Sequence, residues 1–178
     1  MNLNKPIFDI VEDDIQQLIN SGVAERKTVE YKSALPSNSD KDKKEFLADV
    51  SSFANASGGD LIYGITAVNG IPTAIAPLQL VNVDAEVLRL ENIVRDGIRP
   101  RIPGLNIHPI STTSGTVIIM RIPKSWANPH MVIFDNHAKF YSRNSAGKYQ
   151  LDVDELRSAF LLSETAVERI RSFRSNRL

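Results

Sequence analysis

The chain has 178 residues, with 21 Lys and Arg against 21 Asp and Glu, and contains no cysteine. This length suits one domain with a core of its own, and the lack of cysteine excludes disulfides, thiolate zinc sites and cysteine nucleophiles. The longest aliphatic run, residues 117–120, is far shorter than the roughly 18 residues of a membrane helix, and the N-terminus lacks signal-peptide order, so we expect a cytoplasmic protein without a membrane partner.

The first elements are predicted from apolar periodicity. Apolar residues at helical spacing predict a helix over 8–20. Over 27–32 the pattern alternates, which predicts a half-buried strand with Val29 and Tyr31 on one face and charged residues on the other. An aromatic-rich stripe then predicts a helix over about 40–56, capped by the preceding polar loop and ended by Gly58-Gly59.

The rest of the chain mixes further strands and helices. The patterns predict, in order, a strand over 61–65, a hairpin turn at 68–70 into 71–78, a helix over 84–96, strands over 105–110, 116–122 and 139–143, a turn over 144–148 and a helical region from Leu151. This order indicates the α+β class, with one domain over residues 1–160. Residues 161–178 are expected to form a basic helix end that leads into a region beyond this chain.

Charge is distributed unevenly along the chain. Residues 1–89 hold 8 basic and 13 acidic side chains, whereas residues 90–178 hold 13 and 8. The stretch 95–148 has 8 basic and 2 acidic residues, interleaved with aromatic side chains including Trp126 and Tyr141. Such a mixture suits a phosphate backbone with stacked bases, although two halves of opposite charge can also simply face each other within one fold.

The segment from Glu25 to Lys32 carries the most specific chemistry. Glu25 and Glu30 are five residues apart and lie on opposite faces of a straight strand, so they converge only if the chain bends near residues 26–27. If they converge, two carboxylates beside Lys32 suit a divalent metal next to a phosphate. Otherwise Glu30 and Lys32 form an exposed pair on one face of the strand, with little effect on stability.

The run ERKTVEYK, the helix end SSFANASGG, the strand DLIYGI with NGIP behind it, and KFYSRNS occur in this order over roughly residues 8–160. Together they resemble the AlbA-like DNA-binding domain shared with the Schlafen proteins. The resemblance implies a single lobe with a mixed sheet flanked by helices, a nucleic-acid partner, and a place at the N-terminus of bacterial proteins similar to transcriptional regulators.

Schlafen relatives that cleave structured RNA use three acids. The resemblance places Glu25 and Glu30 at two of them, as ligands of Mg²⁺ or Mn²⁺, with Lys32 beside the scissile phosphate. The third acid is expected after the glycine-ending strand, where this chain has residues 66–69, Thr-Ala-Val-Asn. We therefore expect a nucleic-acid-binding module without catalysis and without a cofactor. A metal-dependent endoribonuclease with Glu25, Glu30 and Lys32 as catalytic residues is the first alternative, and a protein-interaction or homodimerisation domain is the second.

The candidate nucleic-acid contacts are basic side chains and one aromatic ring. Tyr141, next to Ser142-Arg143, is predicted to stack a base or sugar. The predicted phosphate contacts are Lys32, Arg95, Arg99, Arg101, Lys139, Arg143 and Lys148.

Overall fold

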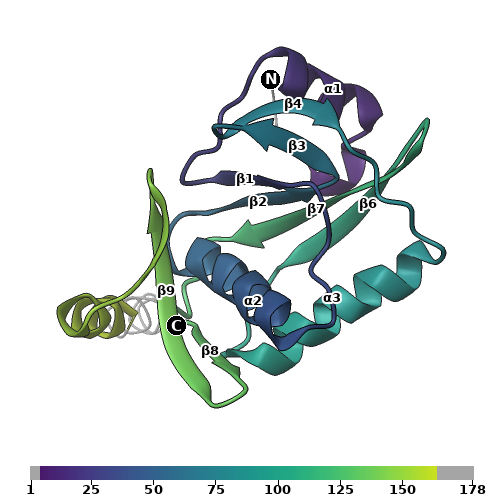
Figure 1. Ribbon diagram of the computed structural model, residues 1–178. Helices are drawn as coiled ribbons and strands as arrows, with labels where there is room; N and C mark the ends of the chain where they lie inside the picture. The colour runs from purple at the N-terminus through teal and green to yellow at the C-terminus, as the bar shows by residue number, and fades with distance from the viewer. Residues whose placement is uncertain (1–4, 164–178) are drawn as a thin grey trace, which may run out of the picture.

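The computed structural model describes residues 5–163. Four strands at its centre form a mixed sheet in the order β1-β2-β7-β6 (Figure 1). β1 and β2 are parallel, and the other neighbours are antiparallel. The strands are β1 (Val29–Lys32), β2 (Gly58–Tyr63), β6 (Asn106–Thr112) and β7 (Gly115–Pro123). β1 is an edge strand, so its outer side faces groups from other parts of the chain.

Both faces of this sheet are covered. A 3-10 turn, η1 (Ile7–Asp9), and α1 (Glu12–Asn20) pack on one face, where Ile62 and Ile119 are buried. α2 (Asp40–Asn55) and α3 (Val83–Gly97) cover the other face, where Leu61 and Met120 are buried. Successive side chains of a strand point to opposite faces, which explains the near-continuous apolar runs of β2 and β7.

β1 alternates differently from its neighbours. Val29 and Tyr31 are buried in the cluster beneath α1, as the alternation predicted. Glu30 and Lys32 consequently point toward the α2 side of the sheet. This places a carboxylate and an ammonium at the rim of the larger core.

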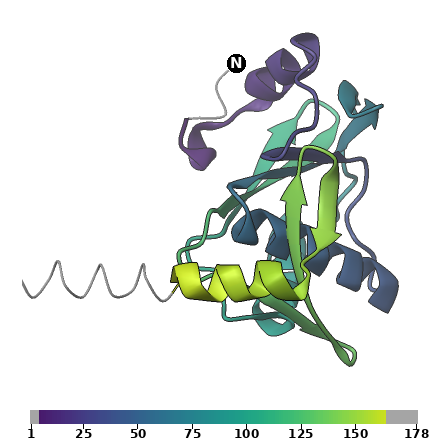
Figure 2. The ribbon, with the colours of Figure 1, turned by 90° about the vertical axis from the view of Figure 1, so that its left-hand side faces the viewer.

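A second sheet packs beside α2 in the order β10-β9-β8-β5. Figure 2 shows the helical segment over residues 153–163 beside β9 and β10, and the Phe140 ring meets that of Phe160 with centroids 6.0 Å apart. The strands are β5 (Ile98–Arg99), β8 (Met131–Phe134), β9 (His137–Asn144) and β10 (Gly147–Gln150). A two-stranded ribbon of β3 (Ile65–Val68) and β4 (Ile71–Ile75) lies near β1 and α1.

Local sequence signals explain where several elements begin and end. The Ser39 hydroxyl accepts from the Asp42 amide at 3.2 Å and caps α2. Gly58 follows this helix with φ 71°, and the turn at Asn69-Gly70 has φ 52° and 74°, the left-handed conformation of a tight hairpin. These caps and turns lie where the sequence predicted them.

The α+β class and the flanking helices are confirmed, and three details differ. The strands divide between two sheets and a ribbon, and the short strands β5, β8 and β10 were not predicted, β10 beginning inside the turn expected over 144–148. The strand expected over 61–65 breaks at Gly64, which has φ 92° and sends the chain into β3. None of the helices within residues 5–163 is long and apolar enough to cross a membrane. The basic end expected over 161–178 falls mostly outside the described residues, which stop at 163.

Candidate nucleic-acid interface

The chain bends just before β1. The Arg26 amide donates to the Val29 carbonyl at 3.1 Å, and the Val29 amide donates back at 3.2 Å. This tight turn brings Glu25 beside β1, where its Oε1 accepts from the Tyr31 amide at 2.9 Å. Glu25 thereby satisfies a donor on the free edge of the sheet, and it lines one cavity of about 330 Å³ together with Glu30.

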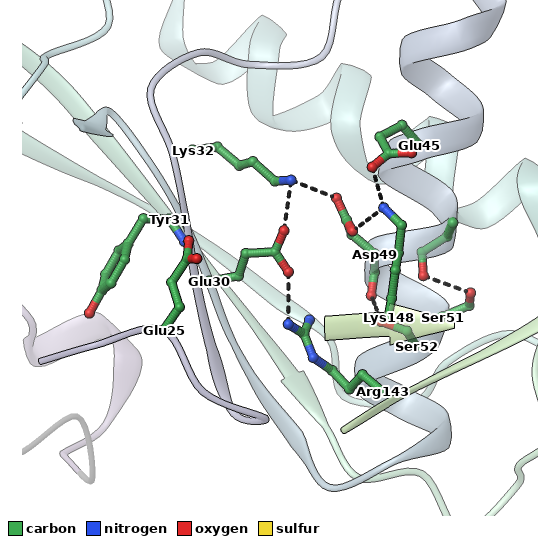
Figure 3. Close-up of polar contacts among 11 residues, drawn as sticks. Glu25, Glu30, Tyr31, Lys32, Glu45, Asp49, Ser51, Ser52, Arg143 and Lys148 are labelled. Atoms are coloured by element: carbon green, nitrogen blue, oxygen red, sulfur yellow. Dashed lines mark hydrogen bonds and ion pairs between the residues drawn. The ribbon is translucent and has the colours of Figure 1, made fainter. Parts of the chain in front are cut away.

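Five charged side chains from four elements meet on the α2 side of β1. We call Glu30, Lys32, Asp49, Arg143 and Lys148 the charge cluster (Figure 3). Lys32 Nζ lies 2.7 Å from Glu30 and 3.2 Å from Asp49, while Arg143 Nη2 lies 2.8 Å from Glu30. Lys148 pairs with Asp49 at 2.5 Å and also contacts Glu45. Each cation of the cluster is thus paired with a carboxylate.

Burial and ion pairing act against each other in this cluster. Burial would raise the pKa of Glu30, but Lys32 and Arg143 hold it below its ordinary value. Burial likewise opposes the charge of Lys32, but Asp49 and Glu30 raise its pKa well above the ordinary range. Burial and the neighbouring Glu30 charge raise the pKa of Asp49 against the pull of Lys148 and Lys32. Ion pairing thus stabilises the charged forms of Glu30 and Lys32, whereas burial and the Glu30 charge favour the neutral form of Asp49.

Arg143 is the most deeply buried cation of the cluster. It is 4% exposed, and its guanidinium stacks on the Phe53 ring with 3.6 Å between Cζ and the ring centroid. Nη2 binds Glu30, whereas Nε and Nη1 have no hydrogen-bond partner among the described residues. In this structure the side chain is part of the core between β9 and α2.

The two glutamates do not fit a magnesium or manganese site in this arrangement. Both carboxylate oxygens of Glu30 are bound by cations, and Glu25 holds a backbone amide. A divalent ion prefers several free oxygen ligands, and it would meet two fixed positive charges here. Among residues 5–163 no group of three His, Asp or Glu side chains is placed to hold a metal ion.

Three of the other predicted contacts gather at the end of α3. Arg95 bonds to Asp96 at 3.1 Å, and Arg99 and Arg101 also lower the pKa of that carboxyl after the larger effect of the Arg95 hydrogen bond. We call Arg95, Arg99 and Arg101 the arginine patch. Arg95 alone of the three forms a described ion pair with that carboxylate, and Arg99 Nη1 donates to the backbone carbonyls of Arg95 and Ile98. Three guanidinium charges thus act near one carboxylate, so the patch carries excess positive charge at the surface.

The last two predicted contacts lie on β9. Lys139 is half-buried opposite Val132 on β8, and no described carboxylate forms an ion pair with it. Tyr141 is half-buried against the larger core, and its carbonyl accepts from the Asn55 side chain at 2.8 Å. The structure therefore brings Lys32, Arg143 and Lys148 together and leaves Lys139, Tyr141 and the arginine patch outside the charge cluster.

Sequence reasoning missed Asp49 in the cluster. Asp49 is 1% exposed, and the sequence signal for this burial was its position within the apolar arc of the helix, three residues after Phe46 and one before Val50. An acid on a buried helix face requires a cation from another element, so its position called for a partner.

A family model indicates the family of this chain, and a solved structure shares its fold. The family model described as Schlafen, AlbA_2 matches residues 25–152. A Corynebacterium diphtheriae crystal structure superposes with a TM-score of 0.51 at 14% identity, covering 78% of this chain and 29% of that chain. The N-terminal domain of a RecG-related protein from Nitrosomonas europaea, described in connection with an ATP-dependent DNA helicase, gives a TM-score of 0.46 at 18% identity over 61% of this chain and 72% of that one. No curated protein matches the chain.

Proposed function

The chain belongs to the Schlafen, AlbA_2 family, and from this premise we propose that it is a nucleic-acid-binding module that does not itself cleave its ligand. The observation that carries the proposal is the arginine patch, where Arg95 pairs with Asp96 and the charges of Arg99 and Arg101 also act on that carboxylate. Excess guanidinium charge at a surface suits phosphate groups, which arginine binds with two parallel hydrogen bonds.

The charge cluster supports the second half of the proposal. Glu30 is bound by Lys32 and Arg143 on both oxygens, which favours a structural role for this glutamate over metal binding. Lys32, Arg143 and Lys148 are matched by carboxylates, so they add little net charge for a phosphate. We therefore base binding on the arginine patch with Lys139, and leave the cluster to hold β1, α2 and the β9–β10 pair together.

The wider setting is also a proposal. The chain spans 29% of the Corynebacterium protein whose fold it shares, which is consistent with a module of a longer, transcriptional-regulator-like protein. We propose a cytoplasmic location for the chain, where a regulator of that kind would meet its nucleic acid. In the expected homodimer, two arginine patches would contact one ligand, and this second contact would raise the apparent affinity.

The test measures binding and cleavage in the same samples. Labelled single-stranded DNA, duplex DNA, single-stranded RNA and an RNA hairpin are followed by anisotropy at about 50 and 200 mM salt, with and without Mn²⁺, then run on a denaturing gel. We expect binding that weakens by about tenfold or more between the two salt concentrations, with intact strands.

Two results would contradict the proposal. Absence of binding to all four ligands would favour a protein-interaction domain. Manganese-dependent cutting of RNA that is lost in Glu30→Gln would establish the endoribonuclease alternative, because that variant keeps the side-chain shape and removes only the carboxylate charge.

A further inference from the structure

A cavity of about 750 Å³ lies at the end of the central sheet where β1 and β2 begin. It is bounded where β1 and β2 begin, where β6 begins and where β7 ends. Gly58 and Gly59 form part of its wall, and a Cβ on Gly59 would come within 2.4 Å of the Thr28 carbonyl oxygen. Side chains are excluded from this part of the wall, which keeps the backbone of two strands close together.

The cavity has a positive lining. Arg26 and Lys124 are exposed at its rim, and no described carboxylate forms an ion pair with either side chain. The one acid in the wall, Asp60, is bound by Arg121 through two contacts of 2.8 and 3.0 Å. Two cations therefore remain unmatched, which favours an anionic ligand.

Trp126 is exposed and lies close in sequence to this lining. Hydrogen bonds fix the loop that carries it. Trp126, the single tryptophan of the chain, is 62% exposed and follows Lys124 by two residues. The Ser125 amide donates to the Ala54 carbonyl at 3.1 Å, and the Ser125 hydroxyl accepts from the Ala127 amide at 3.1 Å. These bonds anchor the loop on both sides of the indole, so the ring is held at the surface.

The same loop adjoins the chain segment that carries Arg99 and Arg101. His130 Nδ1 lies 2.7 Å from the Pro100 carbonyl oxygen, and a Cβ on Gly104 would lie 3.7 Å from Pro123. Segments 99–104 and 123–130 thus run side by side. Arg99 and Arg101 lie on the first of these segments, and Lys124 and Trp126 lie on the second.

We propose that the sheet-end cavity and Trp126 bind a single-stranded segment of nucleic acid. Arg26 and Lys124 contact its phosphates, and Trp126 stacks on one base. Single strands are favoured because a base inside a duplex keeps its faces against its neighbours, whereas an unpaired base can lie flat on an indole. The inference rests on the proposed function and adds the strandedness of the ligand and a second contact surface.

The single tryptophan gives a direct readout. An oligomer of dT and one of rU are titrated into the unmodified chain while the fluorescence of Trp126 is followed, with a duplex of equal length in parallel. We expect quenching by both single strands that is reversed by added salt. The two oligomers distinguish a DNA ligand from an RNA ligand by their relative affinities.

Variants of exposed residues then separate the contributions, with anisotropy of labelled oligomers as the readout. Arg26→Ala with Lys124→Ala is expected to weaken single-strand binding about tenfold and to reduce the slope of log affinity against log salt by about 2. Trp126→Ala is expected to cost about fivefold or more, with Trp126→Phe retaining most of the affinity. Lys41→Ala, an exposed lysine on α2, is the matched control and should leave binding unchanged.

The remaining outcomes show whether this inference or the proposed function fails. Unquenched Trp126 together with wild-type affinity of the Arg26 and Lys124 double variant overturns this inference. If Arg99→Ala with Arg101→Ala abolishes binding in the same series, the proposed function stands without it. Tighter binding of the duplex than of either single strand also overturns the inference. Absence of binding to every probe removes both the inference and the proposed function.

Discussion

The charge cluster and the arginine patch draw cations from the same basic half of the chain but use them differently. In the cluster, Arg143 and Lys148 meet carboxylates from β1 and α2 and are half or fully buried. In the patch, Arg95 pairs with Asp96 at the surface, and Arg99 and Arg101 form no described ion pair. Net charge along a sequence therefore indicates how many cations exist, and only the fold decides which of them remain available to a ligand.

The largest effect that would test this distinction is on stability. Arg143→Ala removes the stacking on Phe53 and leaves Glu30 with one of its two cations. Loss of one partner of a buried ion pair costs about 3–5 kcal/mol, and we expect a decrease of this order in the free energy of unfolding, measured in urea. Arg143→Lys keeps the charge without the planar stack, so its free energy of unfolding should lie between those of wild type and Arg143→Ala. A loss below about 1 kcal/mol would show that the guanidinium is not part of the core.

The complementary effect is on binding. Arg99→Ala with Arg101→Ala should weaken nucleic-acid binding about tenfold and reduce the salt slope by about 2, because two phosphate contacts are lost. The free energy of unfolding should fall by no more than about 1 kcal/mol, because the side chains are exposed and the loss is limited to the bonds of Arg99 to the carbonyls of Arg95 and Ile98. Lys148→Ala is the matched comparison, since we expect it to lower stability and leave the salt slope unchanged. The reverse pattern would assign phosphate binding to the cluster.

The sequence predicted the local part of this arrangement and missed the tertiary part. Alternation over 27–32 correctly placed Val29 and Tyr31 on one face of β1, and the requirement for a bend near residues 26–27 is met by the Arg26–Val29 turn. Both depend on neighbours in the chain.

The partners of Glu30 depend on long-range packing instead. Asp49 and Arg143 reach it only because α2 covers one face of the sheet and β9 packs against α2. A lone Arg in a basic stretch is usually exposed, so its burial against Phe53 had no local signal. The short strands β5, β8 and β10 were missed for a similar reason, since a strand of two to four residues is defined by its pairing partners.

A smaller effect concerns the free edge of β1. Glu25→Ala removes the acceptor of the Tyr31 amide, a loss of about 1 kcal/mol in the free energy of unfolding. Glu25→Gln keeps an oxygen at the same place and should retain most of this stability. Urea unfolding of both variants checks the prediction. Equal destabilisation by Ala and Gln would indicate that the negative charge, rather than the hydrogen bond, is what the site requires.

The smallest effect is a pH dependence carried by Glu30. Its pKa lies below the ordinary value of 4.5 because Lys32 and Arg143 outweigh the effect of burial. A carboxyl whose pKa is lower in the folded state stabilises the fold above its unfolded pKa, and this contribution is lost as the pH falls through the folded value. The difference in unfolding free energy between wild type and Glu30→Gln should therefore be constant near neutral pH and shrink as the pH falls below about 4.5. Glu91→Gln, an exposed glutamate on α3, is the control and should show no comparable trend. A difference that grows on acidification would mean that the two cations do not hold Glu30 ionised, and the view of the cluster as locally matched charge would then fail.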